Sequence, residues 1–126
     1  DHWSRMLEGF AGKRSELLAR AVRDNLADCL VTLPALLQRD AADSLHFWFS
    51  TFGGLRRELF PRLVDAYRST VGADDAVRQV ALRDTAILSE AAQAGRLHFT
   101  ALGQRLLEMD ESAIEALSQE VKSVAL

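Results

Sequence analysis

LHFWFSTFGGLRRELFPRLVDAY, residues Leu45–Tyr67, is the stretch of sequence that decides the fold. It contains six of the nine aromatic side chains of the chain. Its large apolar residues recur at the spacing of one helical face, at positions 45, 48, 49, 52, 55, 59, 60, 63 and 67. A helix with so many aromatic rings on one face must bury that face, because each ring removes a large area from water. The stretch therefore predicts the central helix of an all-α domain.

Two features disturb this predicted helix. Gly53 and Gly54 lower its helix propensity by about 1 kcal/mol each relative to alanine. Pro61 removes a backbone donor and predicts a kink about one turn upstream. Close approach of another helix is the ordinary reason for glycine in a helix. The alternative interpretation is that Gly53 leaves room for a flat ligand against Trp48 and Phe52.

Helical periodicity continues on both sides of the aromatic stretch. A helix is predicted over Ser15–Leu33, with Ser15 as its N-cap and an end or kink at Pro34. A long helix is predicted over Asp75–Met109, antiparallel to the aromatic helix. Together these patterns predict one domain over residues 1–126, an all-α bundle of four to five helices with two long core helices.

The last predicted helix begins near Asp110, a suitable helix-capping residue. Its apolar residues alternate at three- and four-residue spacing, which is typical of a coiled-coil seam: Ile114, Leu117, Val121 and Val124. The seam covers about two heptads and reaches the end of the sequence. It predicts a helix that continues as a coiled coil into a further region, or that pairs with a second copy.

Composition narrows the range of partners. The net charge is −3, and the 15 basic residues are interleaved with acids, so no nucleic-acid partner is expected. No apolar run approaches the roughly 20 residues of a membrane span, so no membrane association is expected. Cys29 is the only cysteine, which excludes an intramolecular disulfide. Its apolar neighbours predict a buried, inert thiol, and we expect a cytoplasmic location.

Two residues of the long helix could carry chemistry. Asp84 has apolar helical neighbours, and we expect it to pair with an arginine of another helix or to lie at the edge of the stripe. His98 follows roughly 21 Å further along the helix, so the two cannot form a catalytic dyad. Gly95 and other small residues near His98 leave space for a facing helix or for a ligand such as haem. A lone histidine on an apolar face is more often a hydrogen-bonded core residue.

The sequence has no catalytic motif. It lacks a phosphate-binding glycine loop, a Gly-x-Ser-x-Gly turn and a closely spaced histidine pair, so neither an enzyme nor a metal site is expected. His46 and the glycines that follow it are compatible with a histidine phosphotransfer domain. That family has lysine and then glycine shortly after the histidine, where this sequence has Phe49 and Ser50, so this interpretation is rejected.

We therefore expect a non-enzymatic regulatory, sensory or dimerisation module of a larger signalling protein, acting as a homodimer or with a protein partner. The layout resembles helical sensor domains of the globin-like kind, in which a long aromatic helix precedes another long helix that continues as a coiled coil. No motif of that family is matched residue by residue. The resemblance implies a pocket for haem or an apolar small molecule, for which the candidate residues are Trp48, Phe52, Gly53, Asp84, Gly95 and His98.

Overall fold

All regular secondary structure is helical in the residues that the computed structural model describes, which are 2–3, 5, 13–39, 42–71 and 85–126. The elements are, in order, α2 (Arg14–Ala27), the π-helical segment η1 (Asp28–Thr32), α3 (Leu33–Gln38), α4 (Ala42–Thr51), α5 (Gly54–Glu58), α6 (Pro61–Val71), α8 (Ala86–Glu108), α9 (Glu111–Ser118) and the 3₁₀ turn η2 (Val121–Ser123). These ranges contain no strand. The prediction of an all-α helical bundle is confirmed.

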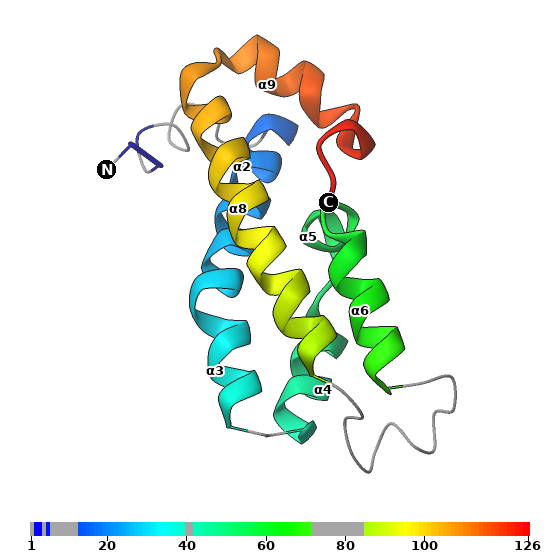
Figure 1. Cartoon of the computed structure of the whole chain (residues 1–126). Coiled ribbons are helices and arrows are strands. Elements are labelled where there is room, and N and C mark those ends of the chain that lie inside the picture. The colour runs from blue at the N-terminus through cyan, green and yellow to red at the C-terminus, as the bar shows by residue number, and fades with distance from the viewer. Residues whose placement is uncertain (1, 4, 6–12, 40–41, 72–84) are drawn as a thin grey trace.

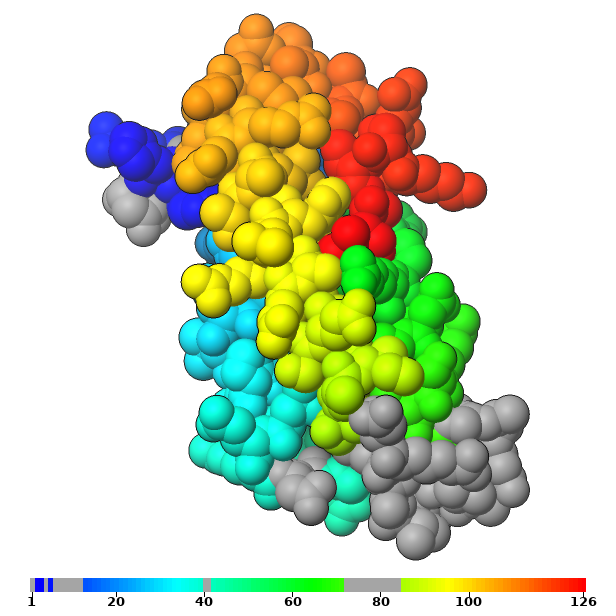
Figure 2. All heavy atoms as spheres, viewed as in Figure 1, coloured from blue at the N-terminus to red at the C-terminus, as the bar shows by residue number. Residues whose placement is uncertain are grey.

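The bundle is arranged around α8. Figure 1 shows this helix between the run α2–η1–α3 on one side and α6 on the other, antiparallel to both. α9 crosses one end of the bundle, and α4 packs beside α3 near the other end. The space-filling view shows α8 along the middle of the same face, flanked by α3 and α6 (Figure 2).

The first run does not end at Pro34. Pro34 lies in the first turn of α3, directly after the π-helical segment η1. The wider π-helical turn accommodates a ring that has no N–H to donate. The predicted N-cap is also wrong: the N-cap is Lys13, and Ser15 lies in the first turn with none of its surface exposed.

The aromatic stretch Leu45–Tyr67 is not a single helix. α4 ends at Thr51, and Gly53 is fully extended, with φ −148° and ψ −171°. Gly54 has φ +63°, a left-handed conformation that glycine adopts without strain. A second break at Leu59 and Phe60 precedes α6, whose first residue is Pro61. Only this last third, α6, forms the predicted antiparallel pair with α8.

The two glycines do not serve close packing. A Cβ atom at Gly53 or Gly54 would meet no atom within 4 Å. The explanation of these glycines by a crossing helix is therefore wrong. Their role is conformational, because they let the chain turn from α4 into α5.

The predicted helix over Asp75–Met109 is α8 where the structure describes it. Residues 75–84 lie outside the described part of the chain, and the helix ends at Glu108, close to the predicted end. Its buried face includes Leu88, Phe99 and Leu106, none of which exposes any surface. Phe99 meets Phe60 edge to face, with the ring centroids 5.0 Å apart.

The predicted coiled-coil seam packs inside the molecule. α9 begins after Asp110, whose side chain accepts a hydrogen bond from the Ala113 N–H at 2.8 Å, so the predicted cap is confirmed. The helix nevertheless ends at Ser118, and the prediction of a helix continuing through residue 124 is wrong. Three residues of the predicted seam are buried in the core: Ile114, Val121 and Val124. The fourth, Leu117, is partly buried and packs against the core.

The last residues turn back onto the bundle because backbone groups there need partners. The Leu126 N–H donates to the Leu59 carbonyl, and the Arg62 N–H at the start of α6 donates to the Leu126 carbonyl, both at 2.9 Å. An N–H in the first turn of a helix has no partner within that helix. The returning segment supplies one.

None of the helices that the structure describes combines the length and the apolar character that a bilayer crossing requires.

Candidate functional site

An apolar surface groove of about 440 Å³ lies between α3 and α4. We call it the α3–α4 groove; its lining residues are Thr32, Leu36, Asp43, Ser44, Phe47, Trp48 and Thr51. The Thr51 hydroxyl donates to the Trp48 carbonyl at 2.8 Å, so this polar group is satisfied within its own helix. The groove therefore offers mainly apolar surface to a partner.

Phe47 is the most exposed aromatic side chain among the described residues, with 72% of its surface accessible. The cause is local. α4 carries aromatic residues at positions 47, 48 and 49, and consecutive residues point to different sides of a helix. Burial of Phe49 in the core leaves Phe47 facing solvent. A large exposed ring beside an apolar groove is typical of an interaction surface.

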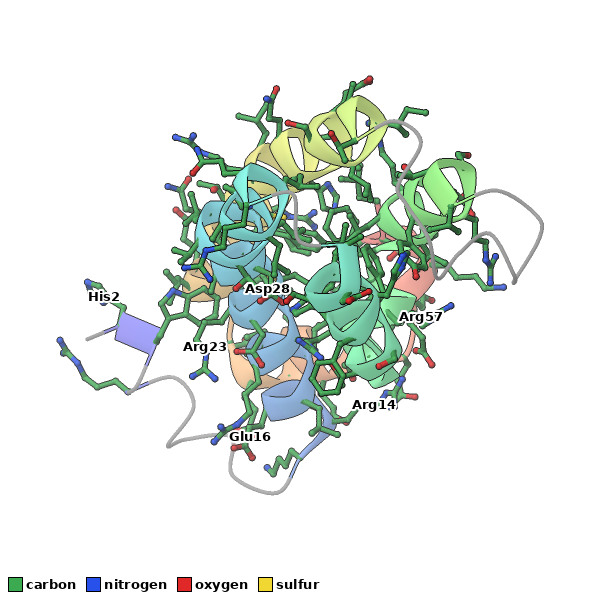
Figure 3. All side chains as sticks on the ribbon, turned by 90° about the horizontal axis from the view of Figure 1, so that it is seen from below. His2, Arg14, Glu16, Arg23, Asp28 and Arg57 are labelled. Carbon is green, nitrogen blue, oxygen red and sulfur yellow. The ribbon has the colours of Figure 1, made fainter. Side chains whose placement is uncertain are left out.

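A second, smaller pocket of about 350 Å³ lies where α4, α5 and α6 meet. We call it the basic pocket; its lining residues are His46, Phe49, Ser50, Arg57, Val64, Tyr67 and Arg68. No acidic residue of the described part of the chain lines it. Figure 3 labels Arg57 beside α4.

Short-range contacts fix the walls of the basic pocket. His46 Nδ1 and the Tyr67 hydroxyl are 2.7 Å apart and form a hydrogen bond between α4 and α6. The rings of Phe49 and Tyr67 stack with centroids 3.9 Å apart and planes at 19°. Arg57 Nη1 donates to the Phe52 carbonyl at 3.2 Å. The pocket is therefore held by contacts that do not depend on a ligand.

A third cleft, of about 580 Å³, lies between α3 and the start of α8, and Cys29 is one of its lining residues. Burial, together with the neighbouring Asp28 carboxylate, raises the pKa of the Cys29 thiol to about 12. A thiol with this pKa stays protonated at neutral pH, and the protonated form is a poor nucleophile. The structure agrees with the prediction of a buried, inert cysteine.

Asp28 joins η1 to α5. Its carboxylate lies 3.3 Å from Arg56 Nη1, and Figure 3 shows it on the side of the first helical run that faces α4 and α5. Burial nevertheless raises the pKa of Asp28, although the hydrogen bond from Thr32 and the charge of Arg56 act in the opposite direction. Burial thus raises the pKa of Asp28 by more than the ion pair lowers it.

The structure brings together one part of the predicted ligand site. Trp48 and Phe52 stack on each other with centroids 4.9 Å apart and planes at 19°. The Arg56 guanidinium lies 5.4 Å from the centre of the Phe52 ring. Gly53 follows directly in the extended link after α4.

The remaining predicted residues lie elsewhere. Gly95 faces Phe60 and Cys29 so closely that a Cβ atom would overlap the Phe60 ring and lie 2.6 Å from Cys29 Sγ. The space expected beside His98 is therefore occupied by a facing segment of the chain. His98 Nε2 donates to the Val124 carbonyl at 2.7 Å. Asp84 lies outside the described residues.

These contacts do not fit a haem. His98 Nε2 is hydrogen-bonded to the returning C-terminal segment and is not available to ligate iron. The small residue next to it, Gly95, is covered by Phe60. Within the described ranges, no group of three or more histidine, cysteine or acidic residues is arranged to hold a metal ion.

Sequence reasoning missed the basic pocket. It considered His46 only as a phosphotransfer residue, whereas the structure places it half-buried against Tyr67. The pairing depends on the chain reversal between α4 and α6, which periodicity does not reveal.

The fold and its surface define an all-α domain with an apolar groove and a separate basic pocket. The chain belongs to the family described as family of unknown function (DUF6866) C-terminal domain, whose model matches residues 1–125. Comparisons with curated proteins and with solved structures found no match.

Proposed function

We propose that this domain is a non-enzymatic interaction module that joins two copies of the protein that carries it. The observation that supports the proposal is Phe47, a ring with 72% of its surface exposed at the edge of the apolar α3–α4 groove. Exposed aromatic side chains beside apolar pockets are the usual anchors of protein interfaces.

A second copy is the occupant that this surface suits best. In a two-fold dimer the same patch of each copy contacts the other, so a protruding group must lie next to a depression that receives it. Phe47 and the groove satisfy this condition, because both belong to one surface between α3 and α4. Each ring would enter the groove of the partner, between Leu36 and Trp48.

Such a contact would regulate how the parts of the protein attached to this domain meet. The family is described as a C-terminal domain. A module of this kind would bring the attached parts of two chains together, and its affinity would set how often they meet. The single buried thiol of Cys29 is compatible with a reducing compartment, and we include a cytoplasmic location in the proposal.

Sedimentation velocity over a wide range of concentrations tests the proposal with Phe47→Lys and a matched control. The control is Leu97→Lys on α8, because Leu97 is 75% exposed and does not line the groove. We expect wild type and the control to form dimers with similar affinity. Phe47→Lys should weaken the dimer at least about tenfold, because it removes an aromatic anchor and places two charges at an apolar contact.

Two results would contradict the proposal. The first is a wild-type protein that stays monomeric at the highest concentration reached. The second is a Phe47→Lys protein that dimerises as well as wild type while its circular dichroism shows an intact fold.

A further inference from the structure

We infer that the basic pocket between α4, α5 and α6 binds a small organic anion, with its carboxylate or phosphate group between Arg57 and Arg68 and a flat apolar body beside the stacked rings of Phe49 and Tyr67. This site is separate from the α3–α4 groove, and the two share no lining residue. The inference therefore does not depend on the proposed dimer.

The two arginines supply the charge that the ligand must balance. Neither forms an ion pair with a carboxylate of the described residues. By contrast, Arg20 and Arg23 each form an ion pair with an acidic residue of their own helix. Two guanidinium groups without acids at one pocket favour an anion, because their N–H groups match carboxylate and phosphate oxygens.

The chain break at Gly53 positions one of these arginines. The Phe52 carbonyl lies just beyond the end of α4, where no following helical N–H can reach it. Arg57 Nη1 donates to this carbonyl at 3.2 Å. The bond uses one nitrogen of the guanidinium and leaves the other N–H groups for a ligand. A side chain held in this way loses less entropy when the ligand binds.

Apolar side chains also line the pocket, and contacts within the protein hold them in place. Phe49 is buried and stacks on Tyr67, and Val64 lies beside them. The bond between His46 and Tyr67 ties α4 to α6 across the pocket. This surface suits the ring of a ligand rather than a fully hydrated inorganic ion.

The volume limits the size of the ligand. Small-molecule pockets span roughly 300–1,000 Å³, and the basic pocket, at about 350 Å³, is at the small end of this range. It has room for a single aromatic ring with one acidic group. A nucleotide, with a base, a sugar and phosphates, would extend well outside it.

Isothermal titration calorimetry of the whole chain tests the inference with four probes: phenyl phosphate, benzoate, inorganic phosphate and benzyl alcohol. We expect saturable binding of phenyl phosphate or benzoate that weakens as salt is added, because exposed charges are screened. Inorganic phosphate should bind at least about tenfold more weakly, because it lacks the apolar body. Benzyl alcohol, which lacks the charge, should not bind measurably.

Arginine variants locate the binding. Arg57→Gln and Arg68→Gln should each weaken binding of the organic anion at least about tenfold. The matched control is Arg96→Gln, because Arg96 lines the cleft beside Cys29 instead. Arg68 is exposed, so its variant should fold even if Arg57→Gln does not. The same variants should leave the groove-dependent dimer unchanged.

Three results would overturn the inference. The first is no saturable binding of either organic anion. The second is equally tight binding of benzyl alcohol or of inorganic phosphate. The third is binding that Arg68→Gln and a folded Arg57→Gln leave within about twofold of wild type, which would place the anion elsewhere.

Discussion

At the scale of single residues, Gly95 has the closest neighbours of the described glycines. The Phe60 ring and Cys29 Sγ lie where its Cβ would be; Cys29 belongs to η1 and Phe60 to the link between α5 and α6. The position therefore requires the absence of a side chain rather than conformational freedom. Glycine at this point of α8 lets the segments that carry Phe60 and Cys29 approach the helix backbone.

Gly95→Ala should lower the free energy of unfolding by about 1–3 kcal/mol, because the added methyl group overfills a packed core. Alanine would otherwise stabilise a helix by roughly 1 kcal/mol relative to glycine, so the sign of the change is informative. The measurement is urea unfolding followed by circular dichroism. Gly53→Ala is the control, since a Cβ there meets nothing and φ is −148°. A Gly95→Ala protein as stable as wild type would contradict the packing.

Asp28 gives a prediction about pH. Burial raises its pKa above the ordinary value of 3.8. The folded state therefore favours the protonated carboxyl, and this contribution to stability is fully present below pH 3.8. It is lost as the pH rises through the raised pKa of the folded protein. The ion pair with Arg56 reduces this loss without reversing it.

Asp28→Asn keeps a neutral side chain at every pH, so it should not show this loss. We expect its free energy of unfolding, relative to wild type, to rise from acid toward neutral pH. The control is Asp65→Asn, which replaces an exposed carboxylate on α6 that does not act on Asp28. A variant that becomes relatively less stable as the pH rises would contradict the direction of the shift.

At the scale of elements, the start of α2 depends on α9. The Ser15 N–H donates to Glu115 Oε2 at 2.8 Å, and Arg14 Nε donates to the Ser118 carbonyl at 2.9 Å. A carboxylate at a helix N-terminus satisfies a free N–H and interacts favourably with the helix dipole. Two elements about a hundred residues apart in the sequence thus complete each other's ends.

Glu115→Ala should lower the free energy of unfolding by about 1 kcal/mol, the usual effect of losing a helix cap. Glu115→Gln keeps an acceptor oxygen and should lose less. The measurement is again urea unfolding, with Glu120→Ala as the control, because Glu120 is exposed just beyond α9. Equal stabilities of the alanine variant and wild type would show that this contact has no role in capping α2.

Element boundaries show where sequence reasoning succeeds and where it fails. Periodicity predicted the helical character of Leu45–Tyr67 and the face that carries Phe49 and Leu63, since burial of apolar residues dominates local structure. It did not predict that Gly53 and Gly54 separate two helices. Their effect depends on whether the following segment gains more by packing in a new direction, which is a tertiary property.

At the scale of the whole molecule, the same limit explains the C-terminal segment. Ile114, Val121 and Val124 have the spacing of a coiled-coil seam, and the structure buries them in the core of their own chain. An apolar stripe indicates that its residues must be buried, but it does not indicate which part of the protein buries them. The position of the C-terminal segment depends on hydrogen bonds with the backbone of Leu59 and Arg62, which the sequence does not reveal.

The candidate sites followed a similar rule. Sequence reasoning found the aromatic pair of Trp48 and Phe52, because the two are one helical turn apart. It did not find the basic pocket, whose residues come from three elements. It expected space beside His98, where the fold places Phe60 and the returning chain. Sites built from one helix were predictable, and sites built across the fold were not.

The central claim, that the α3–α4 groove joins two copies, is tested most directly by the fluorescence of Trp48. Trp3→Phe leaves Trp48 as the only tryptophan, and this indole is half-buried in the groove wall. The proposal predicts that its emission shifts to longer wavelength on dilution, as the groove becomes exposed to water, with the midpoint that sedimentation gives for dissociation. Emission that stays constant across that transition, in a folded protein, would contradict the account by placing the contact elsewhere.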